Sequence, residues 1–189
     1  MFVTMCGRLY RSIIMGWKMD KGYIHVYTGN GKGKTTAALG LSLRAVCAGK
    51  KVYFGQFIKG MKYSELSAPE FLKDFEIHQF GRNCFIFNKP TEEDVLLAKK
   101  GLEEIGRIIA QGSYDIVVLD ELNIAIYYRL VSIEEVLDVL EKKHPETEVI
   151  ITGRYAPKEL IEKADLVTEM TEIKHYYKQG VQARKGIEN

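Results

Sequence analysis

The stretch Gly29-Asn30-Gly31-Lys32-Gly33-Lys34-Thr35-Thr36 decides the fold class of this chain. It follows the apolar run Tyr23–Tyr27 and precedes a run of helical character, Ala37–Cys47. A strand, a glycine-rich turn and a helix start make a phosphate cradle, because the N–H groups of the turn point inward and the helix N-terminus is partly positive. We expect Lys34 to reach the phosphates and the Thr35 hydroxyl to ligate Mg²⁺. This phosphate loop therefore predicts a nucleoside triphosphate site.

The first glycine of the phosphate loop comes one residue late. The common motif is G-x-x-x-x-G-K-[ST], and counting back from Lys34 puts Thr28 at its first position. The glycine follows at Gly29, so the loop is shorter than usual. We expect the triphosphate to lie differently here than in ordinary ATPases.

Length and composition fit one globular domain. The chain has 189 residues, of which 46% are hydrophobic and 28% charged, values ordinary for a soluble domain with a substantial core. The net charge of +2 is too small to indicate a nucleic-acid partner, and no apolar run is long enough to span a membrane. Three cysteines without a C-x-x-C pair favour a reduced, cytoplasmic protein. Residues 1–20 form a predicted N-terminal arm or an overlong start before Met19, and residues 21–189 a single domain.

Short apolar runs alternate with helix-like segments along the chain. The runs are typical of strands buried on both faces of a parallel sheet; they are Tyr23–Tyr27, Lys51–Phe57, Phe75–Phe80, Ile116–Asp120, Glu148–Thr152 and Leu166–Glu169. Capping patterns predict helices that end near Gly49, run from Thr91 to Gly112, begin at Ser132, and run from Pro157 to about Ala164. In the first helix, Leu39, Leu43 and Val46 are expected to share the apolar face. The alternation predicts an α/β fold, doubly wound, with a mostly parallel sheet and helices on both faces.

Ligands of such sheets bind beyond the carboxyl ends of the strands. This rule selects the segments 56–60, 120–123 and 152–154 and the stretch after Phe80. Asp120 and Glu121 end a buried strand and are predicted to complete the Mg²⁺ octahedron that Thr35 begins. Arg154 is expected to neutralise phosphate charge, and Gln56 and Asn123 are further candidates at strand ends.

Several motifs together resemble the P-loop-type ATP:corrinoid (cob(I)alamin) adenosyltransferase family. The matching stretches extend over nearly the whole chain from Gly22 onward; they are TGNGKGKTTAALGLSLRA (28–45), GQFIKG (55–60), VVLDELNIA (117–125), VIITGR (149–154), APKELIEKADLVTEM (156–170), KH (174–175) and GIE (186–188). The resemblance implies a P-loop NTPase-like fold and transfer of the 5′-deoxyadenosyl group of ATP to Co(I) of a corrinoid, with release of triphosphate. ATP is then held in the reverse sense along the loop. The corrinoid supplies the nucleophile, which agrees with the lack of a convincing nucleophile–base pair among Ser, Cys and His.

The resemblance also implies roles for individual residues. Those expected at the nucleotide are Gly29, Asn30, Gly31, Lys32, Gly33, Lys34, Thr35, Thr36, Arg44, Gln56, Glu65, Asn123 and Arg154, and those expected to act in catalysis are Lys34, Phe85, Phe87, Asp120 and Glu121. Phe85 and Phe87 match an aromatic pair near the corrinoid, where apolar rings would exclude water and the lower ligand and so ease reduction of cobalt. The family further implies a homodimer and a reductant protein such as a flavodoxin. The chain departs from the family at Arg184, where glutamine is common, and this puts contacts of the end of the chain in question.

Two other functions stay open on the residues alone. A small-molecule kinase of the same fold needs a base for the acceptor hydroxyl, and Asp120 or Glu121 could serve. A nucleotide switch or nucleic-acid module is the third hypothesis, and the weak net charge argues against its nucleic-acid form. Product analysis separates the first two, because only adenosyl transfer separates adenosine from phosphate.

Overall fold

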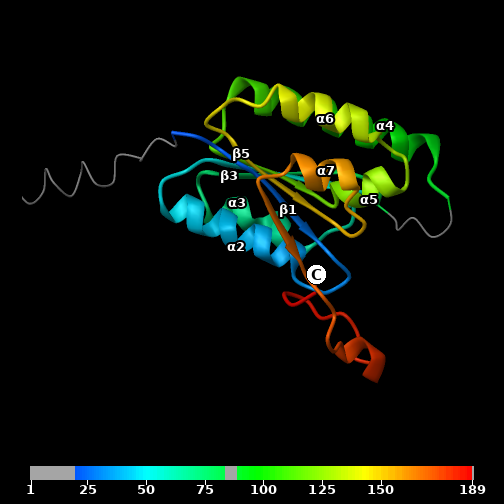
Figure 1. The fold of residues 1–189 in the computed structure, drawn as a ribbon. Coiled ribbons are helices and arrows are strands. Elements are labelled where there is room, and N and C mark those ends of the chain that lie inside the picture. The colour runs from blue at the N-terminus through cyan, green and yellow to red at the C-terminus, as the bar shows by residue number, and fades with distance from the viewer. Residues whose placement is uncertain (1–19, 84–88, 189) are drawn as a thin grey trace, which may run out of the picture.

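A six-stranded parallel sheet forms the centre of the molecule (Figure 1). The structure is a computed structural model and describes residues 20–83 and 89–188. The strands lie in the order β3-β2-β4-β5-β1-β6; their bounds are β1 Ile24–Thr28, β2 Val52–Phe57, β3 Phe75–Phe80, β4 Ile116–Asp120, β5 Glu148–Thr152 and β6 Leu166–Glu169. Each predicted strand is confirmed, with β1 shifted by one residue and β2 starting at Val52 rather than Lys51.

Helices cover both faces of the sheet, which confirms the predicted doubly wound α/β fold (Figure 1). On one face lie α2, Lys34–Cys47, and the short α3, Ala68–Phe71. The other face carries α4 Glu92–Gln111, α5 Leu122–Tyr127, α6 Ile133–Glu141 and α7 Lys158–Lys163. Two 3₁₀ turns, η1 Ser64–Ser67 and η2 Tyr176–Gln179, complete the elements of the described residues. Helices α3 and α5 were not predicted from the sequence.

The alternation of side chains along each strand separates two apolar layers. In β4, Val117 and Leu119 pack under α4 and α6, whereas Ile116 and Val118 pack on the side of α2. Successive side chains of a strand point to opposite faces, so a run of apolar residues is buried on both. Full burial of one such side chain contributes about 1.5–3 kcal/mol.

Small residues form the face of α2 that packs on the sheet. Ala38, Ser42 and Ala45 are buried, and the Ser42 hydroxyl donates to the carbonyl of Ala38 at 2.8 Å. The expectation that Leu43 belongs to this face is wrong, because its side chain is 49% exposed. Leu39 and Val46 are partly buried at the flanks of the contact. The helix that follows the phosphate loop therefore sits close against the sheet.

The start of α4 follows its local sequence signals. Thr91 and Asp94 form a capping box, and Gly112 ends the helix with φ 64°, as predicted. Arg82, just after β3, donates from Nε and Nη2 to the two carboxylate oxygens of Asp94 at 2.7 and 2.8 Å. This bidentate pair ties the exit of β3 to the first turn of α4.

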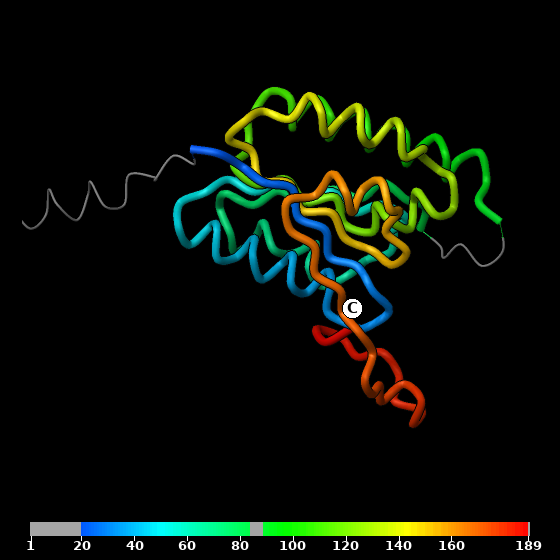
Figure 2. The backbone as a smooth tube through the Cα atoms, in the orientation of Figure 1, coloured from blue at the N-terminus to red at the C-terminus, as the bar shows by residue number. Residues whose placement is uncertain are grey.

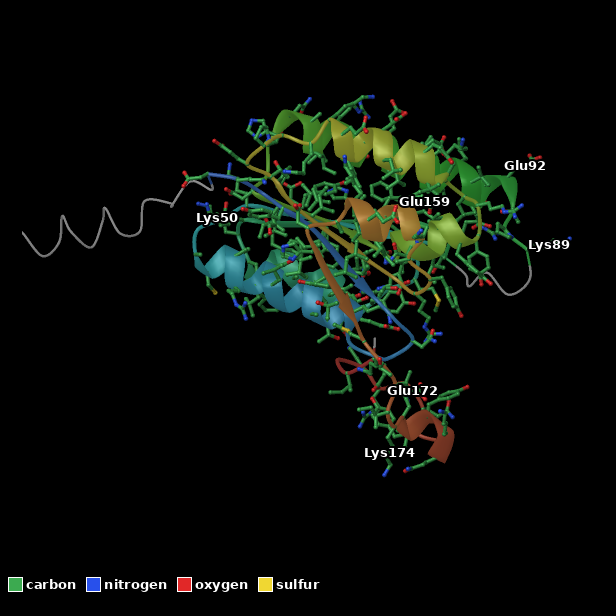
Figure 3. All side chains as sticks on the ribbon, viewed as in Figure 1. Lys50, Lys89, Glu92, Glu159, Glu172 and Lys174 are labelled. Carbon is green, nitrogen blue, oxygen red and sulfur yellow. The ribbon has the colours of Figure 1, made fainter. Side chains whose placement is uncertain are left out.

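The C-terminal segment, residues 170–188, leaves the sheet after β6 and returns along the phosphate loop (Figure 2). Figure 3 shows Glu172 and Lys174 on this segment, away from Lys89 and Glu92 at the start of α4. β6 itself is an edge strand whose four residues are all exposed. Across residues 20–83 and 89–188, no helix is long and apolar enough to cross a membrane.

Candidate active site

The phosphate loop joins β1 to α2 and needs glycine at two positions. Gly29 and Gly33 have φ values of 93° and 122°, which side-chain-bearing residues rarely adopt. A Cβ on Gly29 would also come within 2.4 Å of the carbonyl oxygen of Met170. The glycines thus let the loop bend sharply and lie directly against the C-terminal segment.

Lys34 is buried at the head of α2 with its ammonium turned back onto the loop. Its Nζ donates to the carbonyl oxygens of Gly29 and Gly31 at 2.8 and 2.7 Å. Burial and, less strongly, the nearby Arg154 charge lower the pKa of Lys34, while Glu121 partly offsets them. The two hydrogen bonds hold the ammonium next to the loop, where phosphate oxygens would bind.

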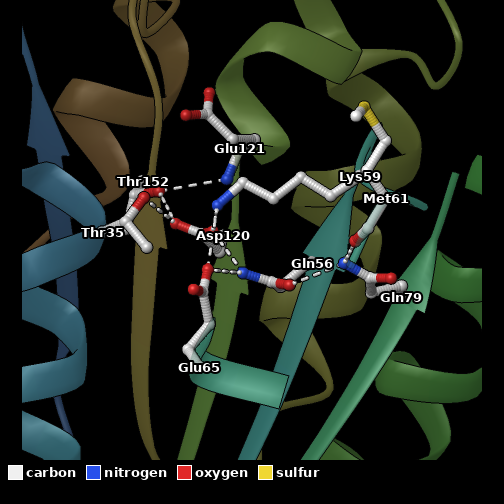
Figure 4. A network of polar contacts seen from close by, with 9 residues as sticks. All are labelled: Thr35, Gln56, Lys59, Met61, Glu65, Gln79, Asp120, Glu121 and Thr152. Carbon is white, nitrogen blue, oxygen red and sulfur yellow. Dashed lines mark hydrogen bonds and ion pairs between the residues drawn. The ribbon is translucent and has the colours of Figure 1, made fainter. Parts of the chain in front are cut away.

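Asp120 is the centre of the polar network in Figure 4. Its side chain is fully buried at the end of β4. Oδ1 accepts hydrogen bonds from the hydroxyls of Thr35 and Thr152 at 2.8 and 2.7 Å. Oδ2 accepts from Lys59 Nζ at 2.8 Å and from Gln56 Nε2 at 3.3 Å. Thr35 and Asp120, which are both predicted Mg²⁺ ligands, contact each other directly, and both carboxylate oxygens of Asp120 accept hydrogen bonds.

Glu121 adopts a left-handed backbone conformation with φ 59°. Such a conformation costs of order 1–3 kcal/mol for a residue with a side chain, and it occurs frequently at functional sites. The N–H of Glu121 donates to Thr152 Oγ1 at 3.0 Å, while its side chain lines the cleft above Asp120. Burial, followed by the Asp120 charge, raises the pKa of Glu121, and Lys59 and Lys34 partly offset this rise.

A second row of contacts fixes the segment after β2. Gln56 Nε2 donates to Glu65 at 2.9 Å, and Gln79 Nε2 donates to Gln56 Oε1 at 3.1 Å and to the carbonyl of Met61 at 3.0 Å. Lys59 lies 3.7 Å from the Glu65 carboxylate as well as against Asp120. Burial alone would lower the pKa of Lys59, but the Asp120 and Glu65 carboxylates outweigh it and raise the pKa.

These groups surround a cleft of about 990 Å³. Predicted residues that line it are Asn30, Gly31, Lys32, Gly33, Lys34, Thr35, Thr36, Glu65, Glu121 and Arg154. Residues to which the sequence assigned no role also line it, among them Lys59, Tyr63 and Ile124, with Glu172, His175, Tyr177, Lys178, Ile187 and Glu188 from the C-terminal segment. The volume suits a ligand of nucleotide size or larger.

The remaining predicted residues lie elsewhere. Gln56, Asp120 and Asn123 are fully buried behind the lining. Asn123 Nδ2 donates to the carbonyl of Gly153 at 2.9 Å and so fixes the turn that carries Arg154, while its Oδ1 has no hydrogen-bond partner among the described residues. Gly29 does not line the cleft, and Arg44 is exposed on α2 away from it. Phe85, Phe87 and residues 1–19 of the predicted arm lie outside the described residues.

The C-terminal segment closes one side of the cleft. Lys32 Nζ donates to the carbonyl of Ile187 at 2.9 Å and lies 3.8 Å from the Glu188 carboxylate. Hydrogen bonds from Arg184 and Tyr176 lower the pKa of Glu188 to about 2. Arg184, the point of departure from the family, therefore has a partner inside the segment, with Nη2 3.2 Å from Glu188.

Lys59 and Thr152 fall in the candidate segments 56–60 and 152–154, but neither was assigned a role from the sequence. Lys59 belongs to GQFIKG after β2, and Thr152 ends β5. A basic or hydroxyl residue at the carboxyl end of a buried strand is the signal that could have selected both.

The side chains present fit a Mg²⁺-bound triphosphate. The hydroxyl of Thr35 and the carboxylates of Asp120 and Glu121 are hard oxygen ligands, which Mg²⁺ prefers. No group of three or more His, Cys, Asp or Glu that could hold a metal occurs in the described part of the chain. Phosphates and water would therefore complete the coordination, as is usual for Mg²⁺ at nucleotide sites.

The parallel sheet, with a glycine-rich loop between its strand β1 and the helix α2, gives this chain an α/β fold of the P-loop NTPase-like type. A family model described as ATP:corrinoid adenosyltransferase BtuR/CobO/CobP matches residues 20–189. The chain therefore belongs to the ATP:corrinoid adenosyltransferase family and is an enzyme of this class. The match gives no support to the small-molecule kinase alternative.

Named relatives agree with the family match. A corrinoid adenosyltransferase of Sinorhizobium sp. is 38% identical over 183 residues, which cover 94% of this chain and 86% of the relative. The corrinoid adenosyltransferase of Escherichia coli K12 is 38% identical, and corrinoid adenosyltransferase CobA of Salmonella typhimurium LT2 is 37% identical. Each of these alignments covers 89% of this chain and 86% of the relative.

Proposed function

We propose that this enzyme transfers the 5′-deoxyadenosyl group of ATP to the Co(I) centre of a corrinoid and releases triphosphate. The observation that carries the proposal is the set of cations around the phosphate loop. Lys32, Lys34, Lys59 and Arg154 all line one cleft next to the Thr35–Asp120 contact. Positive charge fixed in advance where negative charge develops lowers the barrier to leaving-group departure, and triphosphate is the highly charged leaving group of this reaction.

Binding of the nucleotide falls to the phosphate loop. The N–H groups of residues 29–36 would take the phosphate oxygens, and Lys34 would exchange the carbonyls of Gly29 and Gly31 for phosphate. Thr35, Asp120 and Glu121 would hold Mg²⁺, which supplies charge neutralisation at the triphosphate. The short loop supports an ATP molecule lying in the reverse sense, with its 5′-carbon turned towards the corrinoid.

The corrinoid brings its own nucleophile. The enzyme's side chains then need to position the 5′-carbon and exclude water rather than supply a nucleophile. The Co(I) electron pair attacks that carbon, the carbon–oxygen bond breaks, and the electrons leave with the triphosphate. Phe85 and Phe87 are proposed to shield the lower face of the corrinoid and so favour its reduction.

Product analysis after incubation with chemically reduced cobalamin and Mg·ATP tests the function. We expect a new cobalt–carbon bond in the visible spectrum and free tripolyphosphate in equal amount. Lys34→Met should lose at least about 100-fold in kcat/KM, because it removes a charge-assisted phosphate contact. Release of ADP with a phosphorylated acceptor would instead identify a kinase.

The aromatic pair has its own test. Replacing Phe85 and Phe87 together with alanine should impair transfer to a corrinoid that must be reduced on the enzyme. Transfer to pre-reduced corrinoid should change much less. Equal loss in both assays would mean that the rings serve general packing.

A homodimer, a flavodoxin-like reductant and a cytoplasmic location belong to the same proposal. The exposed edge strand β6, with Leu166 and Val167 each more than 40% exposed, supports a covering partner. Light scattering after size-exclusion chromatography should give twice the 21.6 kDa chain mass. Reduction of corrinoid by a flavodoxin in the presence of the enzyme checks the electron donor.

A further inference from the structure

Lys59 lies against Asp120, the carboxylate proposed to bind Mg²⁺, which is an unusual position for a cation. Its Nζ contacts Asp120 Oδ2 at 2.8 Å, and its side chain is only 16% exposed. The other oxygen, Oδ1, is held by the buried hydroxyl of Thr152 and by Thr35. Oδ2 accepts from the buried amide of Gln56 at 3.3 Å and from Lys59, so Lys59 is the charged partner of this oxygen (Figure 4).

The backbone on both sides of Lys59 is constrained. Ile58, directly before it, has φ 63°, which is a strained conformation for a β-branched residue. Gly60, directly after it, lies so close to Arg82 that a Cβ would be 2.3 Å from the carbonyl oxygen of Arg82. Backbone strain that the surrounding packing enforces is common at functional sites. These constraints fix the backbone position from which Lys59 reaches Asp120 at 2.8 Å.

Lys59 also has partners on the cleft side. Glu65 lies 3.7 Å away, and the ring centroid of Tyr63 lies 5.2 Å from Nζ. Lys59, Glu65 and Tyr63 all line the cleft next to the phosphate loop. A lysine side chain is flexible and its ammonium is a compact charge, so it can change partners without movement of the backbone.

A divalent cation and the Lys59 ammonium would repel each other strongly on one carboxylate oxygen. We propose that Lys59 is an exchangeable counter-ion of the active site, paired with Asp120 in the nucleotide-free enzyme and paired with the triphosphate once Asp120 binds Mg²⁺. Lys59 thereby suppresses metal binding in the absence of nucleotide and strengthens binding of the metal–triphosphate complex. The inference rests on the proposed function in that such a complex enters this cleft.

The test compares two titrations of nucleotide-free enzyme by calorimetry, one with MgCl₂ alone and one with Mg·tripolyphosphate. Removal of the charge in Lys59→Met should tighten binding of Mg²⁺ alone by at least about fivefold, because the competing cation is gone. The same variant should bind Mg·tripolyphosphate at least about tenfold more weakly, because a charge-assisted contact is lost. A defect in folding cannot give shifts of opposite sign.

Lys62→Met is the matched control, because Lys62 is an exposed lysine of the same segment that does not line the cleft. This variant should leave the dissociation constants for Mg²⁺ and for Mg·tripolyphosphate unchanged. Lys59→Gln keeps a donor for Asp120 without the charge, and it should reproduce both shifts if Lys59→Met is unstable. The inference is overturned if the dissociation constants of the Lys59 variants for Mg²⁺ and for Mg·tripolyphosphate stay at wild-type values or move in the same direction. Wild-type enzyme that binds neither Mg²⁺ nor Mg·tripolyphosphate would contradict the proposed function instead.

Discussion

Lys32 in the phosphate loop donates a 2.9 Å hydrogen bond to the main-chain carbonyl of Ile187, 155 residues further along the chain. The contact joins the phosphate loop to the C-terminal segment, and both residues line the cleft. Because Ile187 and Glu188 also line the cleft, a bound nucleotide would be enclosed partly by the end of the chain.

Deletion of residues 182–189 should weaken ATP binding. The lost contacts are partly exposed, so we expect about a three- to tenfold rise in Kd, mainly through faster dissociation. Stopped-flow fluorescence with a labelled ATP analogue measures both rates. Ile173→Ala, which changes a side chain of the same segment that is 96% exposed, should behave as wild type. An unchanged dissociation rate after the deletion would show that the segment does not retain the nucleotide.

Thr35→Ala should abolish the metal dependence of the site. The variant loses the predicted Mg²⁺ ligand and the hydroxyl that donates to Asp120 at 2.8 Å. We expect kcat/KM to fall at least about 100-fold, while ATP binding measured in EDTA changes little. Thr35→Ser keeps the hydroxyl and should restore most of the activity. A serine variant as impaired as the alanine variant would assign the loss to the methyl group.

Asp94→Asn should destabilise the fold in a pH-dependent way. Burial alone would raise the pKa of Asp94, but Arg82 and Thr91 hold it below its usual value. A lowered folded-state pKa contributes stability that is present above the unfolded pKa and is lost as the pH falls through the folded pKa. The free energy of unfolding of the variant should therefore be about 2 kcal/mol lower than that of the wild type at pH 7. This difference should shrink below about pH 4.

Urea unfolding at several pH values measures this difference in the free energy of unfolding. Glu93→Gln, in the same helical turn but exposed, should cost less than about 0.5 kcal/mol at each pH. If Asp94→Asn lowers the free energy of unfolding by the same amount at pH 3 and pH 7, the ion pair with Arg82 is not the cause of the loss.

Substitution by alanine should change the free energy of unfolding in opposite directions at two glycines within helices. A Cβ on Gly101 in α4 would lie 2.4 Å from the ring of Phe80, so Gly101→Ala should cost about 1–3 kcal/mol. Gly40 in α2 has nothing within 4 Å of its ideal Cβ, so Gly40→Ala should stabilise the chain by about 0.5–1 kcal/mol. Thermal unfolding of both variants checks the pair, and destabilisation by Gly40→Ala would mean that another surface packs on α2.

Local signals in the sequence predicted most of the fold. Thr91, Asp94 and Gly112 mark the ends of α4 by themselves, because caps and a left-handed glycine act within a few residues. The start of α5 has no such mark, since Glu121 precedes it in a left-handed conformation and no side chain caps it. Leu43 was misplaced because the close approach of α2 to the sheet selects small residues, which periodicity of large apolar residues does not reveal.

Thr35 and Asp120 could also be selected as candidate site residues from local sequence signals. Thr35 belongs to a contiguous motif, and Asp120 follows a strand that its apolar run identifies. The contacts of Lys59 and Thr152 with Asp120 depend on the pairing of β2, β4 and β5, in which Gln56 lies opposite Asp120 and Leu119 opposite Ile151. Such register is set by three-dimensional packing, so the sequence could indicate the segments but not the partners.

Two main-chain hydrogen bonds join the phosphate-loop region to Met170, the residue that follows β6. The N–H of Gly31 donates to the carbonyl of Met170 at 2.7 Å, and the N–H of Met170 donates to the carbonyl of Thr28 at 2.8 Å. Deuterium uptake at the amides of Gly31 and Met170 would consequently report whether the cradle holds its ligand. The two bonds lie between main-chain atoms, so they couple the cradle to the C-terminal segment through the backbone.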